Sequence, residues 1–508
     1  AAVTDALSGL EGLLSSLAVS GELSTTSAGT SNVRVGVNAG NSITSGGNYN
    51  VLVGDEAGTA LTTGDDNVAI GFEALSTEDT GTRSVAVGYR SLKAQNNDST
   101  NYNVAVGYDA GLSISTGVEN VIIGGKAGDA LTTGGGNVAI GRASLTTDTV
   151  GSKSTAIGFQ TLQTQNYGTA TNSLNTAVGY QAGTAVTTGV QNTLLGALAG
   201  DALTDADENV VVGMNALASD TLGSGSVAIG HQALFAQNFT TATNAYNVAV
   251  GKNAGVAVTT GVKNTFVGGF AGDAYTTSNN NVAVGYAALS SDTKGTKNVA
   301  VGFEALLDQN LTTNTDAYNV AVGYHAGTNV TVGTINTLIG GEAGDALTTG
   351  DSNAALGYLA LSSDTQGDQS VAVGAGALKT QNFTSSQGSL NVAVGYNAGT
   401  AVTSARANTL IGHSAGTLLT SGNSNTALGY AALASDTLGD RNVALGRGAL
   451  LSQNFTTSTD SYNTAVGYDA GASVTTGTQN TLIGGLSGDA LTTADFNVAV
   501  GYASLGNE

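Results

Sequence analysis

Hydrophobic and polar positions follow a short pattern that recurs along almost the whole chain. The stretch that begins at Asn247 reads NVAVGKNAGVAVTTGVK, and variants of it begin at Asn264, Asn281, Asn298 and Asn319. The spacings between these starts are 17, 17, 17 and 21 residues, which make a module of 72 residues. A period this regular predicts stacked, similar units instead of a globular domain.

The repeats predict one continuous repeat domain over residues 32–508. A slightly irregular module of four units begins at Asn32, and a partial module of three units begins at Asn463, so the domain has 27 units in total. Between them lie five regular modules of four units, which open at Asn103, Asn175, Asn247, Asn319 and Asn391.

Each unit contains one apolar strand. In residues 281–285 the side chains of Val282 and Val284 point to one face of this strand, and that of Ala283 points to the other. We expect one face to fill the inside of its own coil. The other face, which carries only Ala, suits the close approach of a neighbouring chain.

Two turns should complete each unit. The Gly that follows the strand, such as Gly285, indicates a turn with positive φ or with no room for a Cβ atom. A second short strand is expected through Ala288 and Leu289, followed by an outer turn of the type Thr-Thr-Gly or Ser-Asp-Thr.

A unit of 17 residues is too short for a β-α-β crossover, so the pattern predicts an all-β, parallel β-solenoid of 17- and 21-residue coils. The Asn at the head of most units is expected to form a ladder along the stack. Because so thin a coil encloses few large side chains, we expect a single chain to be unstable alone. Three chains would share their Ala and Val faces as a homotrimeric rod.

Residues 1–22 follow a different pattern. Apolar residues at spacings of four and three predict a short coiled-coil helix, either the end of a trimerising stalk or a cap on the solenoid: Val3, Leu7, Leu10, Leu14 and Leu17. Residues 23–31 form a polar connector. The chain begins with Ala and shows no signal peptide, so we expect a processed product or part of a longer chain.

Composition excludes several partners and chemistries. The net charge is −22, from 37 acidic and 15 basic residues, and would repel the phosphates of nucleic acid. There is no cysteine, hence neither disulfide nor thiol chemistry. No apolar run approaches the roughly 20 residues that a membrane helix needs, so we expect no membrane insertion.

The motif [NS]-[VT]-x-[VIL]-G-x-x-[AS]-[GL] resembles that of two related families. It is similar to the head repeats of trimeric autotransporter adhesins, and it resembles more closely the repetitive shaft of bacteriophage tail fibres, where strings such as NTAVGYQAG, here residues 175–183, recur. The resemblance implies a left-handed β-roll, intertwined or packed as a homotrimer. It also implies an extracellular role in a virion tail fibre or a cell-surface appendage, where the shaft presents a host-binding tip.

Two other functions stay open at this point. The chain could be a trimeric surface adhesin that binds host or matrix glycans through lateral loops, or the subunit of a self-assembling extracellular filament. We expect neither an enzyme nor a cofactor, because no Ser/His/Asp set is identifiable and the Gly-rich turns open no helix that could hold a phosphate.

The fourth unit of each module carries four extra residues, which enlarge one turn. Its amide and aromatic groups are candidates for contact with a host cell-surface glycan or receptor, with avidity from their repetition. The alternative is that the Phe packs on a neighbouring chain and the loop braces the trimer. The candidate residues are Gln237, Asn238, Phe239, Tyr246, Gln309, Asn310, Tyr318, Gln381, Asn382, Phe383, Gln453, Asn454, Phe455 and Tyr462.

Other recurring polar residues are weaker candidates. Gly-Asp-Ala turns place an Asp at equivalent sites, where a cation is conceivable but a solvated turn Asp is commoner: Asp129, Asp201, Asp273, Asp345 and Asp489. His231, His325 and His413 never repeat in register and are interpreted as solvent-facing turn residues. We expect no metal site, and we expect no ice binding from the adjacent Thr pairs.

Overall fold

The computed structural model describes residues 28–506, which fall into an N-terminal unit, up to Ala206, and a C-terminal unit, from Asp207. Within the described residues the chain forms strands and turns and no helix, so the prediction of an all-β, parallel β-solenoid is confirmed. The predicted coiled-coil helix in residues 1–22 lies outside the described residues, as does the connector as far as residue 27.

The N-terminal unit contains ten three-residue strands, one in each coil. They are β1 (Val33–Val35), β2 (Val51–Val53), β3 (Val68–Ile70), β4 (Val85–Val87), β5 (Val104–Val106), β6 (Val121–Ile123), β7 (Val138–Ile140), β9 (Thr155–Ile157), β11 (Thr176–Val178) and β12 (Thr193–Leu195). A separate pair of two-residue strands joins β8 (Gly151–Ser152) to β10 (Thr171–Asn172).

The C-terminal unit repeats this plan with seventeen three-residue strands. They are β13 (Val210–Val212), β15 (Val227–Ile229), β17 (Val248–Val250), β18 (Thr265–Val267), β19 (Val282–Val284), β21 (Val299–Val301), β23 (Val320–Val322), β24 (Thr337–Ile339), β25 (Ala354–Leu356), β27 (Val371–Val373), β29 (Val392–Val394), β30 (Thr409–Ile411), β31 (Thr426–Leu428), β33 (Val443–Leu445), β35 (Thr464–Val466), β36 (Thr481–Ile483) and β37 (Val498–Val500). Two-residue strands pair β14 (Gly223–Ser224) with β16 (Thr243–Asn244), β20 (Gly295–Thr296) with β22 (Thr315–Asp316), β26 (Gly367–Asp368) with β28 (Gln387–Gly388), and β32 (Gly439–Asp440) with β34 (Thr459–Asp460).

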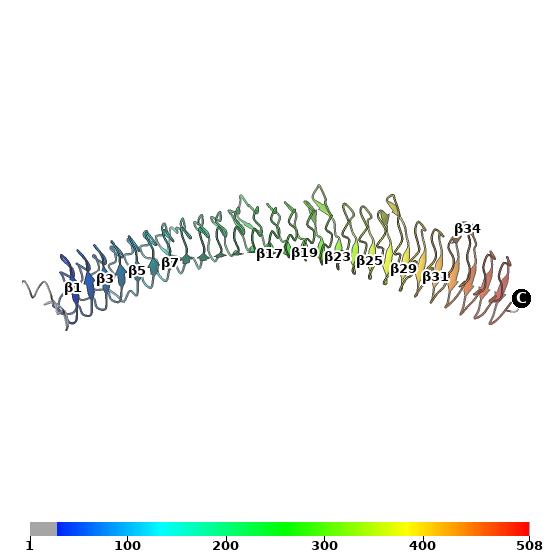
Figure 1. Cartoon of the computed structure of the whole chain (residues 1–508), viewed down its shortest axis with the longest axis horizontal. Coiled ribbons are helices and arrows are strands. Elements are labelled where there is room, and N and C mark those ends of the chain that lie inside the picture. Colours follow the sequence, from blue (N-terminus) through cyan, green and yellow to red (C-terminus); the bar gives the residue numbers. More distant parts are fainter. Residues whose placement is uncertain (1–27, 507–508) are drawn as a thin grey trace, which may run out of the picture. The chain divides into compact units, whose positions relative to one another are not determined.

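Within each unit, every three-residue strand pairs in parallel with the strand of the next coil (Figure 1). The register places equivalent residues side by side: Val282 pairs with Val299, and Ala283 with Ala300. Side chains of one kind therefore form continuous columns across successive coils. We number the positions of a coil from the Asn or Ser that heads it, so that Val282 is at position 2 and Tyr286 at position 6.

The two faces of the strand are used in the opposite way to the one predicted. Ala283, at position 3, is fully buried inside its own coil, while Val282 and Val284 lie on the outside and are half-buried. The expectation that the Ala face meets a neighbouring chain is therefore wrong. The interior of the coil is narrow, and a small side chain fits there where the opposite turn already supplies a Leu.

Two positions fill the core in alternation, position 3 in the strand and position 9 in the turn, and this alternation explains the four-coil module. In second coils the strand supplies a large inward residue, such as Phe266, and position 9 is Gly both in that coil, Gly272, and in the preceding coil, Gly255. A Cβ at Gly272 would lie 2.4 Å from Phe266 Cε1, and one at Gly255 would lie 2.8 Å from Phe266 Cδ2. In third and fourth coils position 3 is Ala, with Val211 as the one exception in the described residues, and position 9 is Leu, such as the buried Leu289.

The Gly at position 5 has the geometry that the sequence predicts. Gly268 has φ +138°, and a Cβ there would lie 2.2 Å from the carbonyl oxygen of Gly285 in the next coil. The predicted second strand through Ala288 and Leu289 is wrong, since both residues lie in a turn, where Leu289 has φ 52°. That turn lets the chain reverse within a few residues and still point the Leu inward.

The predicted Asn ladder is confirmed, and it is fully buried. The backbone N–H of Asn264 donates to Oδ1 of Asn247 at 2.9 Å, and that of Asn281 donates to Oδ1 of Asn264 at 3.0 Å. The Asn264 side-chain amide also donates to the Ser278 carbonyl oxygen, across its own coil, at 2.8 Å. One side chain thus joins successive coils and closes its own coil.

Candidate contact surfaces

The enlarged turns of the fourth coils are anchored by a buried polar network. Gln237, at position 12, is fully buried, and its side-chain amide donates to Oδ2 of Asp220 at 2.6 Å and to Oγ of Ser226 at 3.1 Å. Its Oε1 accepts from the side-chain amide of Asn247 at 2.8 Å. The equivalent Gln309, Gln381 and Gln453 are also buried and each donates to an Asp at position 12 of the coil before.

The carboxylate in this network is buried as well. Oδ1 of Asp292 accepts from the backbone N–H groups of Gly295 at 2.9 Å and of Leu311 at 3.1 Å. Oδ2 accepts from Gln309 at 2.6 Å and from the Tyr275 hydroxyl at 3.0 Å. Burial raises the pKa of Tyr275 well above its usual value, so this hydroxyl stays protonated and keeps its donor.

The aromatic rings of the enlarged turns lie inside the chain. Phe239, Phe383 and Phe455 are each about 5% exposed, and Leu311 and Tyr167 take the same place in the other two turns. A Cβ at Gly223, in the coil before, would lie 2.8 Å from the Phe239 ring, so the ring packs on its own chain. Neither these rings nor the Gln side chains are open to a ligand on the surface.

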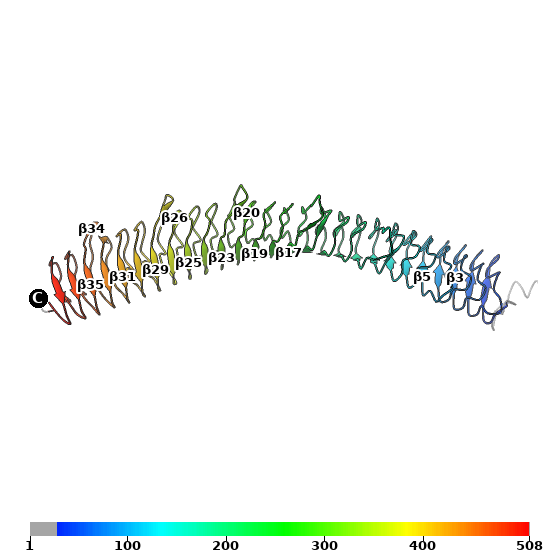
Figure 2. The same ribbon diagram turned by 180° about the vertical axis from the view of Figure 1, so that it is seen from behind.

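The candidate Asn residues of the same turns are exposed. Asn238, Asn310, Asn382 and Asn454 each use Oδ1 to accept a hydrogen bond from a Thr of the preceding coil, at 3.2, 3.2, 3.0 and 2.9 Å. The two-residue strands β20, β26 and β34 lie at the margin of the C-terminal unit opposite the three-residue strands (Figure 2). The contact role of these turns stays a prediction.

The three candidate Tyr residues are half exposed, and two of them lie beside basic side chains that the sequence did not single out. Nζ of Lys297 lies 4.9 Å from the centre of the Tyr318 ring, and it donates to Oδ2 of Asp316 at 2.6 Å and to the Tyr318 hydroxyl at 2.9 Å. These hydrogen bonds raise the pKa of Lys297 and lower that of Asp316. Arg441 pairs with Tyr462 in the same way, whereas the ring of Tyr246 covers Gly225.

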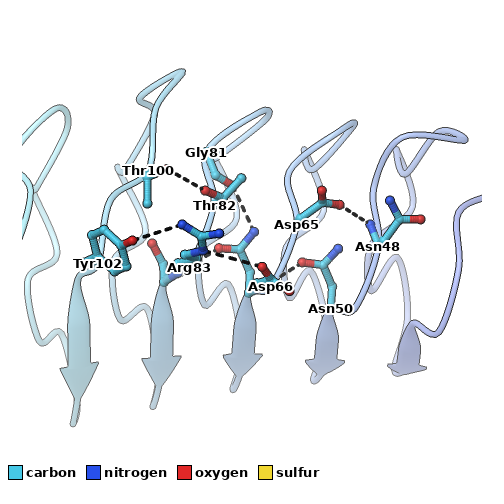
Figure 3. Close-up of polar contacts among 11 residues, drawn as sticks. Asn48, Asn50, Asp65, Asp66, Gly81, Thr82, Arg83, Thr100 and Tyr102 are labelled. Atoms are coloured by element: carbon cyan, nitrogen blue, oxygen red, sulfur yellow. Dashed lines mark hydrogen bonds and ion pairs between the residues drawn. The ribbon is translucent and has the colours of Figure 1, made fainter.

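The N-terminal unit contains a related group, drawn in Figure 3. Arg83 donates to the Tyr102 hydroxyl at 3.0 Å, and its Nε lies 3.6 Å from Oδ2 of Asp66. Position 17 of the third coil is Arg83, Lys297 or Arg441 where the fourth coil ends in Tyr102, Tyr318 or Tyr462, so these pairings could have been found by aligning modules in the sequence.

The outer face of the sheet, formed by the side chains at positions 2 and 4, is apolar, although the sequence predicted that these side chains would fill the inside of the coil. Positions 2 and 4 form two columns of Val, Thr, Ile and Leu that are half-buried or exposed along both units, and Leu195 and Leu356 reach 47% and 46% exposure. Exposed apolar patches of more than a few hundred square ångströms mark interaction surfaces in soluble proteins. This outer face is therefore a candidate interface.

Position 6 adds a column of exposed rings beside the outer face. In the N-terminal unit Phe72, Tyr89 and Tyr108 stack with centroids 5.4 and 5.1 Å apart, and in the C-terminal unit Tyr286, Phe303 and Tyr324 stack at 5.5 and 5.6 Å. His413 continues the column between Tyr396 and Tyr430, at 5.1 and 5.2 Å. The stacked rings offer their edges to solvent.

Two of the three histidines are less open than predicted. His413 is exposed, as expected, but His231 and His325 are only half exposed, and Nε2 of His325 lies 3.0 Å from Oε2 of Glu304. Across residues 28–506, no three His, Asp or Glu side chains are grouped closely enough to hold a metal ion. The same residues include no helix of a length and hydropathy that could cross a membrane.

Comparison with known proteins adds no relationship: no protein-family model matches the chain, and a search of curated proteins finds no significant match.

Proposed function

We propose that the chain is the structural shaft of an extracellular fibre, such as a bacteriophage tail fibre, and that it holds a host-binding tip away from its anchor. In this proposal it works as a homotrimeric rod of left-handed 17- and 21-residue coils, and its action is mechanical, without turnover.

The outer face of the sheet carries the proposal. Each coil closes its own small core, yet leaves the two outward side chains of its strand, which are apolar in most coils and include one Thr in the rest, half-buried or exposed. A chain that served only to space two ends would gain nothing from this exposure in water. Burial of the two columns against further copies returns about 25 cal/mol for each square ångström of apolar surface, and the gain accumulates with every coil.

Solution mass tests the trimer. Sedimentation equilibrium of the full chain should give three times the chain mass of 49.8 kDa. A variant with Val267→Lys, Val284→Lys and Val301→Lys, which places charges on three neighbouring coils of the outer face, should dissociate and keep its β-sheet circular dichroism. The control variant carries Thr240→Lys, Thr312→Lys and Thr384→Lys on the exposed turns and should stay trimeric.

Other outcomes would identify another function. A wild-type chain that is monomeric at every concentration would refute the trimeric shaft. Open-ended association would support the filament subunit instead.

A second candidate function is an adhesin that binds host or matrix glycans through its enlarged turns. The exposure of Asn238 and Tyr246, and of their equivalents in later modules, favours it. Replacement of the four exposed Asn residues by Ala should abolish binding of the purified repeats to host cells if this candidate is right. Repeats that show no such binding in the first place exclude it.

A further inference from the structure

The Asp of the Gly-Asp-Ala turns occupies position 10 of second coils, and in most of these turns one of its oxygens is buried without a partner. Oδ1 of Asp201, Asp273, Asp345 and Asp489 is shielded from solvent, and no hydrogen-bond donor reaches it. The fifth member, Asp129, differs because the hydroxyl of Thr146 in the next coil donates to its Oδ1. At Oδ1, therefore, Asp129 has a donor and the other four aspartates have none.

A carboxylate oxygen in this position is costly. A buried polar atom without a hydrogen bond loses its hydration and gains nothing in return, and the loss is larger when the atom shares a negative charge. Protonation removes that charge, so the folded chain favours the neutral acid. Accordingly, burial raises the pKa of Asp201, Asp273 and Asp345 above the usual value.

Neighbouring charges do not account for this at two of the three sites. Burial is the first cause at Asp201 and Asp273, where only hydrogen bonds oppose it, one of them from Ser290 to Asp273. Asp345 also faces Glu342, which raises its pKa further, and His325, which lowers it. Asp201 and Asp273 are therefore the cleaner pair for an experiment.

We propose that the Gly-Asp-Ala turns make this solenoid more stable in mildly acidic solution, because proton uptake at Asp201, Asp273 and Asp345 stabilises the fold. The sign follows from linkage: an acid that binds its proton more tightly when folded stabilises the fold at low pH, and this contribution is lost as the pH rises through the folded-state value. The inference concerns the fold alone and does not depend on the proposed function.

Thermal unfolding of the full chain, followed by circular dichroism between about pH 5 and pH 7.5 at constant ionic strength, tests the proposal. The wild-type midpoint should rise as the pH falls. In the double variant Asp201→Asn and Asp273→Asn the rise should be smaller, and at neutral pH this variant should unfold at least about 2 °C above the wild type, because the amide carries no charge to desolvate.

A matched control separates this effect from the general loss of negative charge on acidification. The variant Asp129→Asn and Asp308→Asn removes the same number of charges, one from the partnered turn and one from an exposed position, and should follow the wild-type pH dependence. An equal pH dependence in all three proteins would overturn the proposal. So would a double variant that is less stable than the wild type at every pH.

Two further measurements keep the proposal testable if the double variant does not fold. Infrared spectra of the wild-type chain with labelled Asp should retain a protonated carboxyl band at a pH where free Asp is ionised, and its absence would overturn the proposal. Calcium added alone at neutral pH should not raise the wild-type midpoint. A calcium-dependent rise that Asp201→Asn and Asp273→Asn remove would show that these turns take a cation instead of a proton.

Discussion

Asp292 offers the sharpest test of how the enlarged turns are held. Replacement of Asp292 by Ala removes the acceptor of four buried donors: the backbone N–H groups of Gly295 and Leu311, the Gln309 side chain and the Tyr275 hydroxyl. Each donor left without a partner costs about 1–3 kcal/mol. Removal of the buried charge returns part of this cost, so we expect a net local destabilisation of about 3 kcal/mol.

The loss should be confined to neighbouring coils, because each coil of a solenoid contacts only its neighbours. Native-state hydrogen exchange resolves such local changes. In Asp292→Ala, the amides of Gly295 and Leu311 should exchange about 100-fold faster than in the wild type, since every 1.4 kcal/mol corresponds to a factor of ten. Amides of the module that begins at Asn391 should keep their wild-type rates.

A control and a refuting result complete this prediction. Asp316 lies in the enlarged turn of the next coil and is exposed; its ion pair with Lys297 is at the surface, and only its hydrogen bond from Thr296 is partly buried, so Asp316→Ala should change these rates by less than about tenfold. If Asp292→Ala changes exchange at Gly295 and Leu311 no more than Asp316→Ala does, the buried carboxylate does not hold the turn.

Three further results are expected. Gly268→Ala should abolish stable folding of its coil, because the added Cβ would lie 2.2 Å from the Gly285 carbonyl oxygen and the residue has φ +138°. Limited proteolysis should then cleave the variant near residue 268. A variant as resistant to the protease as the wild type would contradict this prediction. Asn264→Ala should destabilise by about 2–4 kcal/mol in chemical denaturation, since it breaks the ladder on both sides, whereas Asn244→Ala, at an exposed position, should have little effect. Gly255→Leu should destabilise more than Ala317→Gly, because a Leu at Gly255 competes with the Phe266 ring for one space; thermal unfolding of the two variants decides this.

The stacking of the coils could be predicted from the sequence because its signals are local and repeated. Asn at position 1 and Gly at position 5 recur in most units, and each has one physical role. The Asn forms the hydrogen-bonded ladder, and the Gly forms a turn without room for a side chain. Which face of the strand points into the coil could not be predicted in the same way. Since both faces of Val282, Ala283 and Val284 are apolar, their alternation does not show which face is inside.

A comparison of coils within the module contains the missing information. Where Phe266 takes the place of Ala at position 3, position 9 is Gly in the same coil and in the coil before, which indicates that positions 3 and 9 share the interior. The burial of Gln237 was missed for a related reason, because an amide beside a Phe suggests an exposed loop. Its signal is Asp220, seventeen residues earlier at the same position of the preceding coil, which replaces an apolar residue there.

The division of the core between strand and turn constrains how such a chain can change length during evolution. Loss of a second coil alone would remove a large inward residue such as Phe266 and leave the Gly of the preceding coil, Gly255, beside an empty space. Loss of a third coil alone would leave a buried Gln, such as Gln309, without the Asp that accepts its hydrogen bond. Duplication or deletion of whole modules of 72 residues avoids both defects. Relatives of this chain that differ in length should therefore differ in steps of four coils, so that gene rearrangement sets the length of the solenoid in discrete increments.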